Sequence, residues 1–127
     1  MMPLRFLRKT VYVRVRMNEI DVRHIEFDRR VVERSQMGFT TQRLLIGNFT
    51  EAGATLQRAM SEVHNGRWYV PSPFVLMHPL DMVVGGLSQV EDRVLRELAT
   101  FAGARAIDVW VGPELTDQEV IQRAGDA

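Results

Sequence analysis

The chain has 127 residues, which is the usual length of one domain. Its residues are 46% hydrophobic and 25% charged, which is an ordinary composition for a globular protein. That composition excludes a disordered or fibrous chain, and the absence of cysteine excludes disulfides, a thiolate nucleophile and cysteine-ligated zinc. No apolar run approaches the ~20 residues of a membrane helix, and residues 1–10 lack the apolar centre of a secretory signal. We expect one cytoplasmic domain over residues 1–127, without a transmembrane segment.

The zero net charge conceals a gradient along the chain. Residues 1–43 hold ten Lys/Arg and five Asp/Glu, whereas residues 44–127 hold six and eleven. A basic end suits nucleic acid, the anionic surface of a membrane or an acidic protein. A solvated face of a sheet is the preferred interpretation, and nucleic acid is not expected, because no aromatic side chains are interleaved with the cations. The possible basic interaction face comprises Arg14, Arg16, Arg23, Arg29 and Arg30.

The first third of the chain alternates between apolar and polar residues. Period two in β-branched sequence predicts half-buried strands, here an antiparallel meander. The phase of the alternation slips at Ile25 and Phe27, which predicts a bulge or a turn there. The expected strands cover residues 10–17, 20–24 and 31–33, with turns at 17–19 and 28–30.

Helices and buried strands alternate in the rest of the chain. Thr50 is the expected N-cap of the first helix, and Asn65-Gly66 supplies its left-handed stop. Two S/T-x-x-E capping boxes, beginning at Ser88 and Thr116, open the other two helices. Pro71 and Pro73 hold the chain extended before an apolar strand. The helices are expected at 51–64, 89–102 and 117–123, and the strands at 74–77 and 107–111, the last covered on both faces.

The predicted order is therefore β-β-β-α-β-α-β-α. Hairpins followed by strand–helix crossovers imply an α/β fold in which a mixed five-stranded sheet has flanking helices.

The sequence contains few motifs that indicate a catalytic or binding site. The histidines, His24, His64 and His78, lie on different elements without metal-type spacing, so surface or strand-end positions are expected and no metal site is predicted. His78 and Asp81 follow an apolar strand, where α/β proteins often bind ligands, but turn chemistry explains them too. Gly85-Gly86 lacks a phosphate-loop motif. Glu91 could be a general base, although its capping box already uses it. The weak catalytic candidates are thus Glu91, His78 and Asp81, and no cofactor is expected.

Residues 88–105, S-Q-V-E-D-R-V-L-R-E-L-A-T-F-A-G-A-R, resemble the pattern T-E-V-E-R-R-A-x-R-E-x-A-x-x-A-G-A-R of MreB, the bacterial actin-like filament family that guides rod shape. The similarity continues to Pro113, and upstream it includes residues 73–77, 46–60 and 11–13, although it is weak before Gly47. It is specific over residues 88–113. The resemblance implies a ribonuclease H-like fold, corresponding to the first half-domain of the actin-like proteins.

The same resemblance argues against ATP hydrolysis. When the chain is aligned with the family's first phosphate loop, D-L-G-T-A-N, Pro3 stands in place of the aspartate and Arg5 in place of the glycine. The chain has no counterpart of the second phosphate loop. Glu91 matches the glutamate that positions water in the family, but phosphoryl transfer needs several loops at once. The resemblance therefore implies a non-catalytic structural or regulatory protein, linked to cell shape or the bacterial cytoskeleton, with a protein partner or self-association. The alternative is a small ligand-binding domain or enzyme on the same scaffold, with a site near His78, Asp81 and Glu91.

Overall fold

The computed structural model describes residues 9–66 and 72–126, and its elements follow the predicted order. Pro71 and the positions Pro3 and Arg5 lie outside these ranges. Three antiparallel strands come first, since β1 pairs with β2 and β2 with β3. The later strands are parallel: β4 pairs with β1, and β5 with β4. The strands are β1 (Thr10–Arg16), β2 (Glu19–His24), β3 (Arg29–Arg34), β4 (Phe74–Pro79) and β5 (Ala106–Val109).

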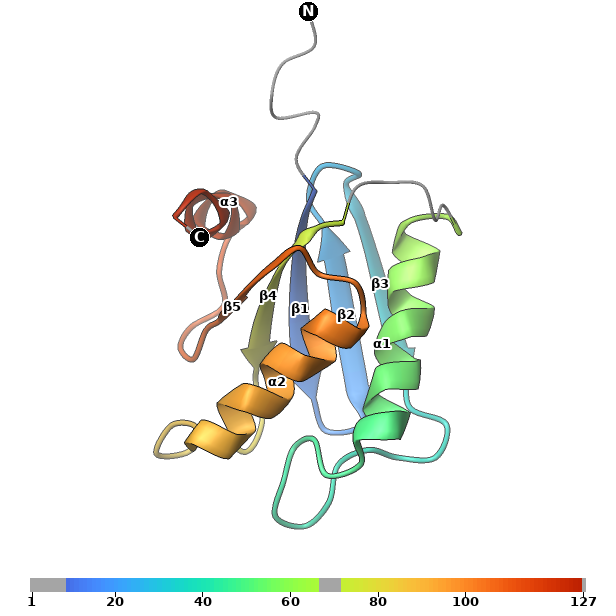
Figure 1. Cartoon of the computed structure of the whole chain (residues 1–127), viewed down its shortest axis with the longest axis vertical. Coiled ribbons are helices and arrows are strands. Elements are labelled where there is room, and N and C mark those ends of the chain that lie inside the picture. Colours follow the sequence, from blue (N-terminus) through green and yellow to red (C-terminus); the bar gives the residue numbers. More distant parts are fainter. Residues whose placement is uncertain (1–8, 67–71, 127) are drawn as a thin grey trace, which may run out of the picture.

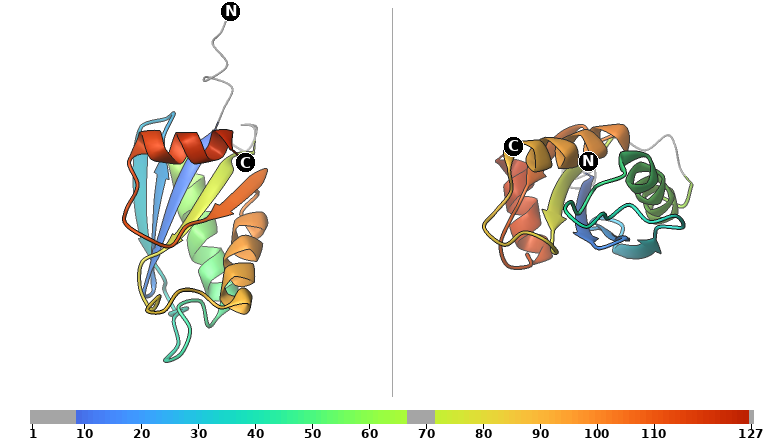
Figure 2. Two further views of the ribbon diagram at one scale, coloured as in Figure 1. Left: turned by 90° about the vertical axis from the view of Figure 1, so that its left-hand side faces the viewer. Right: turned by 90° about the horizontal axis from the view of Figure 1, so that it is seen from below.

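The sheet has the strand order β3-β2-β1-β4-β5, so β1 is the central strand, with β2 and β4 on either side of it. Two helices, α1 (Phe49–Val63) and α2 (Gln89–Phe101), cover one face, and α3 (Asp117–Gly125) lies across the other face at one end (Figures 1 and 2). The mixed five-stranded sheet with flanking helices is thus confirmed. Among the described residues no helix is both long and apolar enough to span a bilayer.

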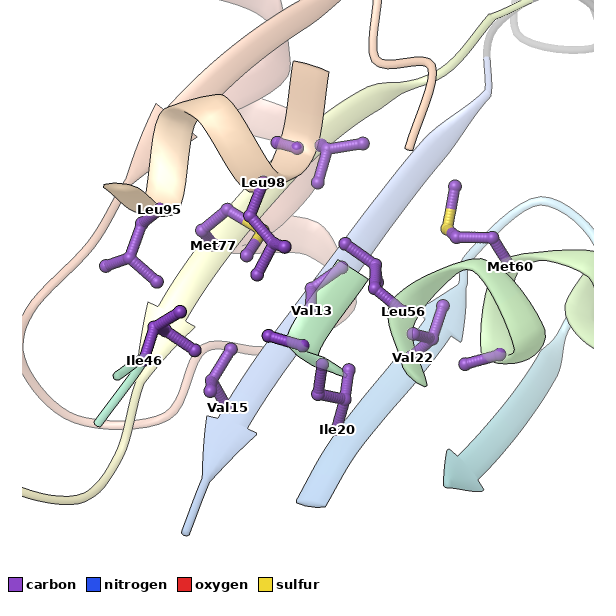
Figure 3. Packing of buried hydrophobic residues seen from close by; sticks show 14 of the residues in the cluster. Val13, Val15, Ile20, Val22, Ile46, Leu56, Met60, Met77, Leu95 and Leu98 are labelled. Atoms are coloured by element: carbon purple, nitrogen blue, oxygen red, sulfur yellow. The ribbon is translucent and has the colours of Figure 1, made fainter. Parts of the chain in front are cut away.

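The main core lies between the sheet and the α1–α2 layer. Val13, Val22 and Met77 point from three strands toward Leu56 of α1 and Leu98 of α2 (Figure 3). Strand alternation sends every second side chain to this face, and the 3.6-residue stripe of each helix meets them. A smaller second core lies under α3 and contains Tyr12, Phe74, Leu76 and Val120.

Several predicted boundaries were wrong. The turn expected at residues 28–30 lies earlier, and β3 extends over Arg29–Arg34 rather than 31–33. The helix α1 begins at Phe49 with Asn48 as its N-cap, not with Thr50, because the Asn48 N–H bonds to Phe39 O and Phe49 packs edge-on against Phe101. The last strand, β5, is an edge strand of Ala106–Val109 rather than 107–111, and its residues pack partly buried against the cores on both faces of the sheet, as predicted.

Candidate functional site

An apolar pocket lies at the end of the sheet where β4 ends and α2 begins. Its cavity volume is about 30 Å³, the room of roughly one water molecule. Small-molecule sites usually enclose roughly 300–1,000 Å³, so the pocket fits part of a side chain and not a whole metabolite. Asp81 and Glu91 are its only charged lining residues among the described part of the chain. The apolar lining is Leu44, Leu45, Ile46, Met82, Val83, Leu87, Val90, Val94 and Leu95, with Pro79.

The rim of the pocket exposes large apolar side chains. Val90 is 68% exposed and Leu44 is 40% exposed, and Val84 on the neighbouring loop is fully exposed. Isolated exposed apolar residues are ordinary on protein surfaces, whereas these lie next to one another around a concave apolar site, which makes this end of the sheet the candidate site. We call Leu44, Val90 and the pocket between them the apolar end surface.

Asn18 fixes the loop that forms one wall of this pocket. It adopts a left-handed φ of 57° in the β1–β2 turn, and its Oδ1 accepts hydrogen bonds of 2.8 Å from the N–H groups of Phe39 and Thr40. The Thr40 hydroxyl in turn donates to Leu45 O at 2.8 Å. Phe39 is fully buried, so the loop is anchored by packing as well as by hydrogen bonds. The sequence analysis missed Asn18, although an asparagine within a tight turn is the available signal.

Gly47 allows the same loop to fold back on itself. A Cβ at this position would lie 2.1 Å from Thr41 Cγ2, closer than any real contact. The Gly47 N–H donates to Phe39 O at 2.8 Å, which closes the loop just before α1.

Asp81 and Glu91 each already hold backbone groups. Asp81 Oδ2 accepts a 2.8 Å hydrogen bond from the Met17 N–H and so ties the loop after β4 to the β1–β2 turn. Glu91 Oε1 accepts from the Ser88 N–H at 3.0 Å, and Ser88 Oγ accepts from the Glu91 N–H at 3.2 Å. The predicted capping box is thus confirmed, and both carboxylates add negative charge to the rim of the pocket.

His78 lies on the opposite face of the sheet. It is fully buried, with Nδ1 2.6 Å from the Tyr12 hydroxyl and Nε2 2.8 Å from Gly112 O. Since Gly112 O can only accept, Nε2 carries the proton and the Tyr12 hydroxyl donates to Nδ1. The same hydroxyl accepts a hydrogen bond from the Leu115 N–H at 3.2 Å. Tyr12 and His78 together therefore hold the β5–α3 loop against the sheet. Burial lowers the pKa of His78, which favours this neutral form.

The three weak catalytic candidates are therefore not assembled into one site. The structure brings Asp81 and Glu91 to the same pocket but separates His78 from them by the sheet. The reason is strand alternation: Met77 and Pro79 face the α1–α2 layer, whereas His78 between them faces the other side.

Of the predicted surface or strand-end positions, His24 and His78 do lie at strand ends, but none of the three histidines is on the surface, because each is buried. His24 stacks on Phe27 with ring centroids 3.9 Å apart, and His64 meets His24 edge-on at 5.0 Å. Burial, followed by the positive charges of neighbouring groups, lowers the pKa of His24 to about 3. Burial also lowers the pKa of His64. No cluster of three metal-ligating side chains occurs in residues 9–66 and 72–126.

The possible basic interaction face is not one face. Arg29 lies on the side of α1, where its guanidinium bonds to Asn65 and to Glu62 O. The other four arginines lie on the face that α3 partly covers, and each has an acidic partner. The pairs join Arg14 to Asp21 and Glu114, Arg16 to Glu114, Arg23 to Asp28 and Asp117, and Arg30 to Asp21.

Asp21 is the centre of this ion-pair network and is only 2% exposed. Burial alone would raise its pKa, but the hydrogen bonds and charges of Arg30 and Arg14 outweigh burial, so the pKa lies below its ordinary value. Arginines neutralised in this way offer little free positive charge to a polyanion.

Comparison with known proteins identifies a relative but no activity. No protein-family model matches the chain. The chain is 38% identical over 99 residues to the uncharacterized protein YjaA of Escherichia coli (strain K12), an alignment that covers 74% of this chain and 75% of that protein. The chain belongs to the YjaA family.

Proposed function

We propose that this YjaA-family protein is a non-catalytic interaction protein that binds a partner protein through the apolar end surface. The observation that carries the proposal is the small apolar pocket with the exposed side chains of Leu44 and Val90 at its rim. A pocket of this size accepts the tip of one apolar side chain, and the carboxylates of Asp81 and Glu91 complement a neighbouring basic residue. The fitting occupant is therefore a short segment of a protein in which a large apolar residue is flanked by Lys or Arg.

We further propose that the fold is ribonuclease H-like and related to the first half-domain of MreB. The strand order β3-β2-β1-β4-β5, with only β2 antiparallel to the others, supports this proposal, as do two crossover helices on one face and the third on the other. The resemblance of residues 88–113 to MreB provides independent support, because it does not depend on the strand order.

The proposed partner is an actin-like filament of the bacterial cytoskeleton. The resemblance of residues 88–113 to MreB, a filament-forming family, supports this partner class. A catalytic role for His78, Asp81 and Glu91 is not part of the proposal, because the sheet separates His78 from the two carboxylates.

Co-sedimentation with MreB filaments tests this function. The purified protein is expected to pellet with filaments, and Val90→Asp is expected to weaken binding at least about tenfold by placing a charge in the apolar contact. Val111→Asp is the matched control, since Val111 is also an exposed valine but does not line the pocket. Absence of co-sedimentation, or equal binding by Val90→Asp, would overturn the proposed partner. Tight binding of ATP and magnesium, measured by calorimetry, would contradict the non-catalytic role.

A further inference from the structure

The edge strand β3 leaves backbone hydrogen-bonding groups without a neighbouring strand. It pairs only with β2 among the described strands. Backbone groups of consecutive residues in a strand point in opposite directions. Because the Ser35 N–H donates to Asn18 O of the β2 side, the groups of Arg29, Val31 and Glu33 face β2. Those of Arg30, Val32 and Arg34 face outward, and Arg34 O accordingly accepts from the Arg58 side chain.

A second copy of this chain matches this edge in one antiparallel register. Two copies related by a two-fold axis can pair only in registers that set outward-facing residues opposite each other. When the two-fold axis passes through Val31, Arg30 of each copy lies opposite Val32 of the other copy. Each of these two pairs exchanges two backbone hydrogen bonds, which gives four in all. The same register sets Arg29 opposite Glu33, and Asp28 opposite Arg34, on both sides of the axis.

The neighbouring registers lack this charge complementarity. Centring on Val32 sets Arg30 opposite Arg34 twice, and centring on Arg30 sets the two copies of Arg30 against each other. Like charges directly opposite each other destabilise a strand pair, whereas opposite charges stabilise it. Arginines on an edge strand also deter pairing with unrelated strands. Glu33 is the acidic residue that lies opposite Arg29 in the Val31-centred register, and it therefore makes the edge specific for a second copy.

The helix α1 packs against both β2 and β3, so the helix layer reaches this edge of the sheet. The edge is opposite β5 in the sheet order and does not include a residue of the pocket.

We propose that this protein forms a homodimer in which two β3 strands pair antiparallel about Val31, joining the two sheets into one. This inference does not depend on the proposed partner, and the apolar end surface stays free in the dimer. Sedimentation velocity of the full chain is expected to give about twice the mass of the 14.6 kDa chain.

Val32→Pro tests the backbone contact. Its proline removes an outward N–H and leaves the ladder with β2 intact, so a folded monomer is expected. Val32→Thr keeps both the N–H and the β-branched shape, and this matched control is expected to remain dimeric.

Charge exchange tests the register even where the proline variant fails to fold. Glu33→Arg and Arg29→Glu are each expected to be monomeric, because each sets like charges opposite one another. An equimolar mixture of the two is expected to recover the dimer mass, because both cross-strand pairs become opposite in charge. A wild-type chain that stays monomeric at every concentration, a folded Val32→Pro dimer, or a mixture that stays monomeric would overturn the proposal. Val90→Asp is expected to leave the dimer intact, which separates this result from the proposed function.

Discussion

Tyr12 shows how one side chain can join two layers of this protein. Its ring lies in the second core under α3, and its hydroxyl links His78 to the β5–α3 loop through Leu115. Alternation predicted Tyr12 on a strand, and His78 was expected just after another strand, but the sequence did not predict their contact. The contact needs β4 beside β1, with Tyr12 in register with Leu76, and a sequence pattern does not state which strands are neighbours.

Tyr12→Phe is expected to lower the free energy of unfolding by about 1–3 kcal/mol. The ring packing is kept, but His78 Nδ1 loses its donor and the Leu115 N–H loses its acceptor in a buried place. Urea unfolding measures the change. Thr100→Ala is the matched control, since it removes an exposed hydroxyl bonded to Arg96 O and is expected to cost less. Equal losses in the two variants would contradict the role given to the Tyr12 hydroxyl.

At the scale of elements, the sequence predicted helix ends correctly where neighbouring residues determine them, and incorrectly where tertiary contacts do. Ser88 and Thr116 cap their helices as predicted, because a capping box depends only on two residues three positions apart in the sequence. The N-cap prediction at Thr50 was wrong because distant residues, Phe39 and Phe101, fix the start of α1. The candidate site was predictable only in part for the same reason. Asp81 and Glu91 were noted individually, but the apolar pocket between them depends on a loop held by Asn18.

Asn18→Gly tests how that loop is held. Glycine keeps the left-handed turn but removes the acceptor of the Phe39 and Thr40 N–H groups, so a loss of about 1–3 kcal/mol is expected. Asn65→Gly is the matched control, because Asn65 has a similar φ of 55° and its side chain binds only an exposed arginine. Thermal unfolding compares the two variants. A larger effect at Asn65 would contradict the anchoring role of Asn18.

At the scale of the whole molecule, the three buried histidines make stability depend on pH. Burial lowers the pKa of His24 to about 3 and lowers those of His64 and His78, whereas an unfolded histidine has a pKa of about 6.5. Unfolding therefore takes up protons below about pH 6.5. The stability from the neutral histidines is complete above that pH and is lost as the pH falls, down to about 3 for His24.

The free energy of unfolding is expected to fall between pH 6.5 and 4.5 by up to about 1.4 kcal/mol per pH unit for His24, and His64 and His78 add to this fall in the same direction. Urea titrations at several pH values measure this slope, and His24→Gln is expected to make it shallower. A free energy that stays constant from pH 7.5 to 5 would contradict the buried, neutral state of these side chains.

Crosslinking inside cells is the sharpest test of the proposal that the apolar end surface binds an actin-like filament. A photo-crosslinking amino acid in place of Val90 is expected to attach MreB, identified by mass spectrometry, whereas the same group at Val111 is expected not to. Val90 adjoins the pocket and Val111 does not, although both are exposed. Crosslinking of MreB at both positions, or at neither, would contradict the claim.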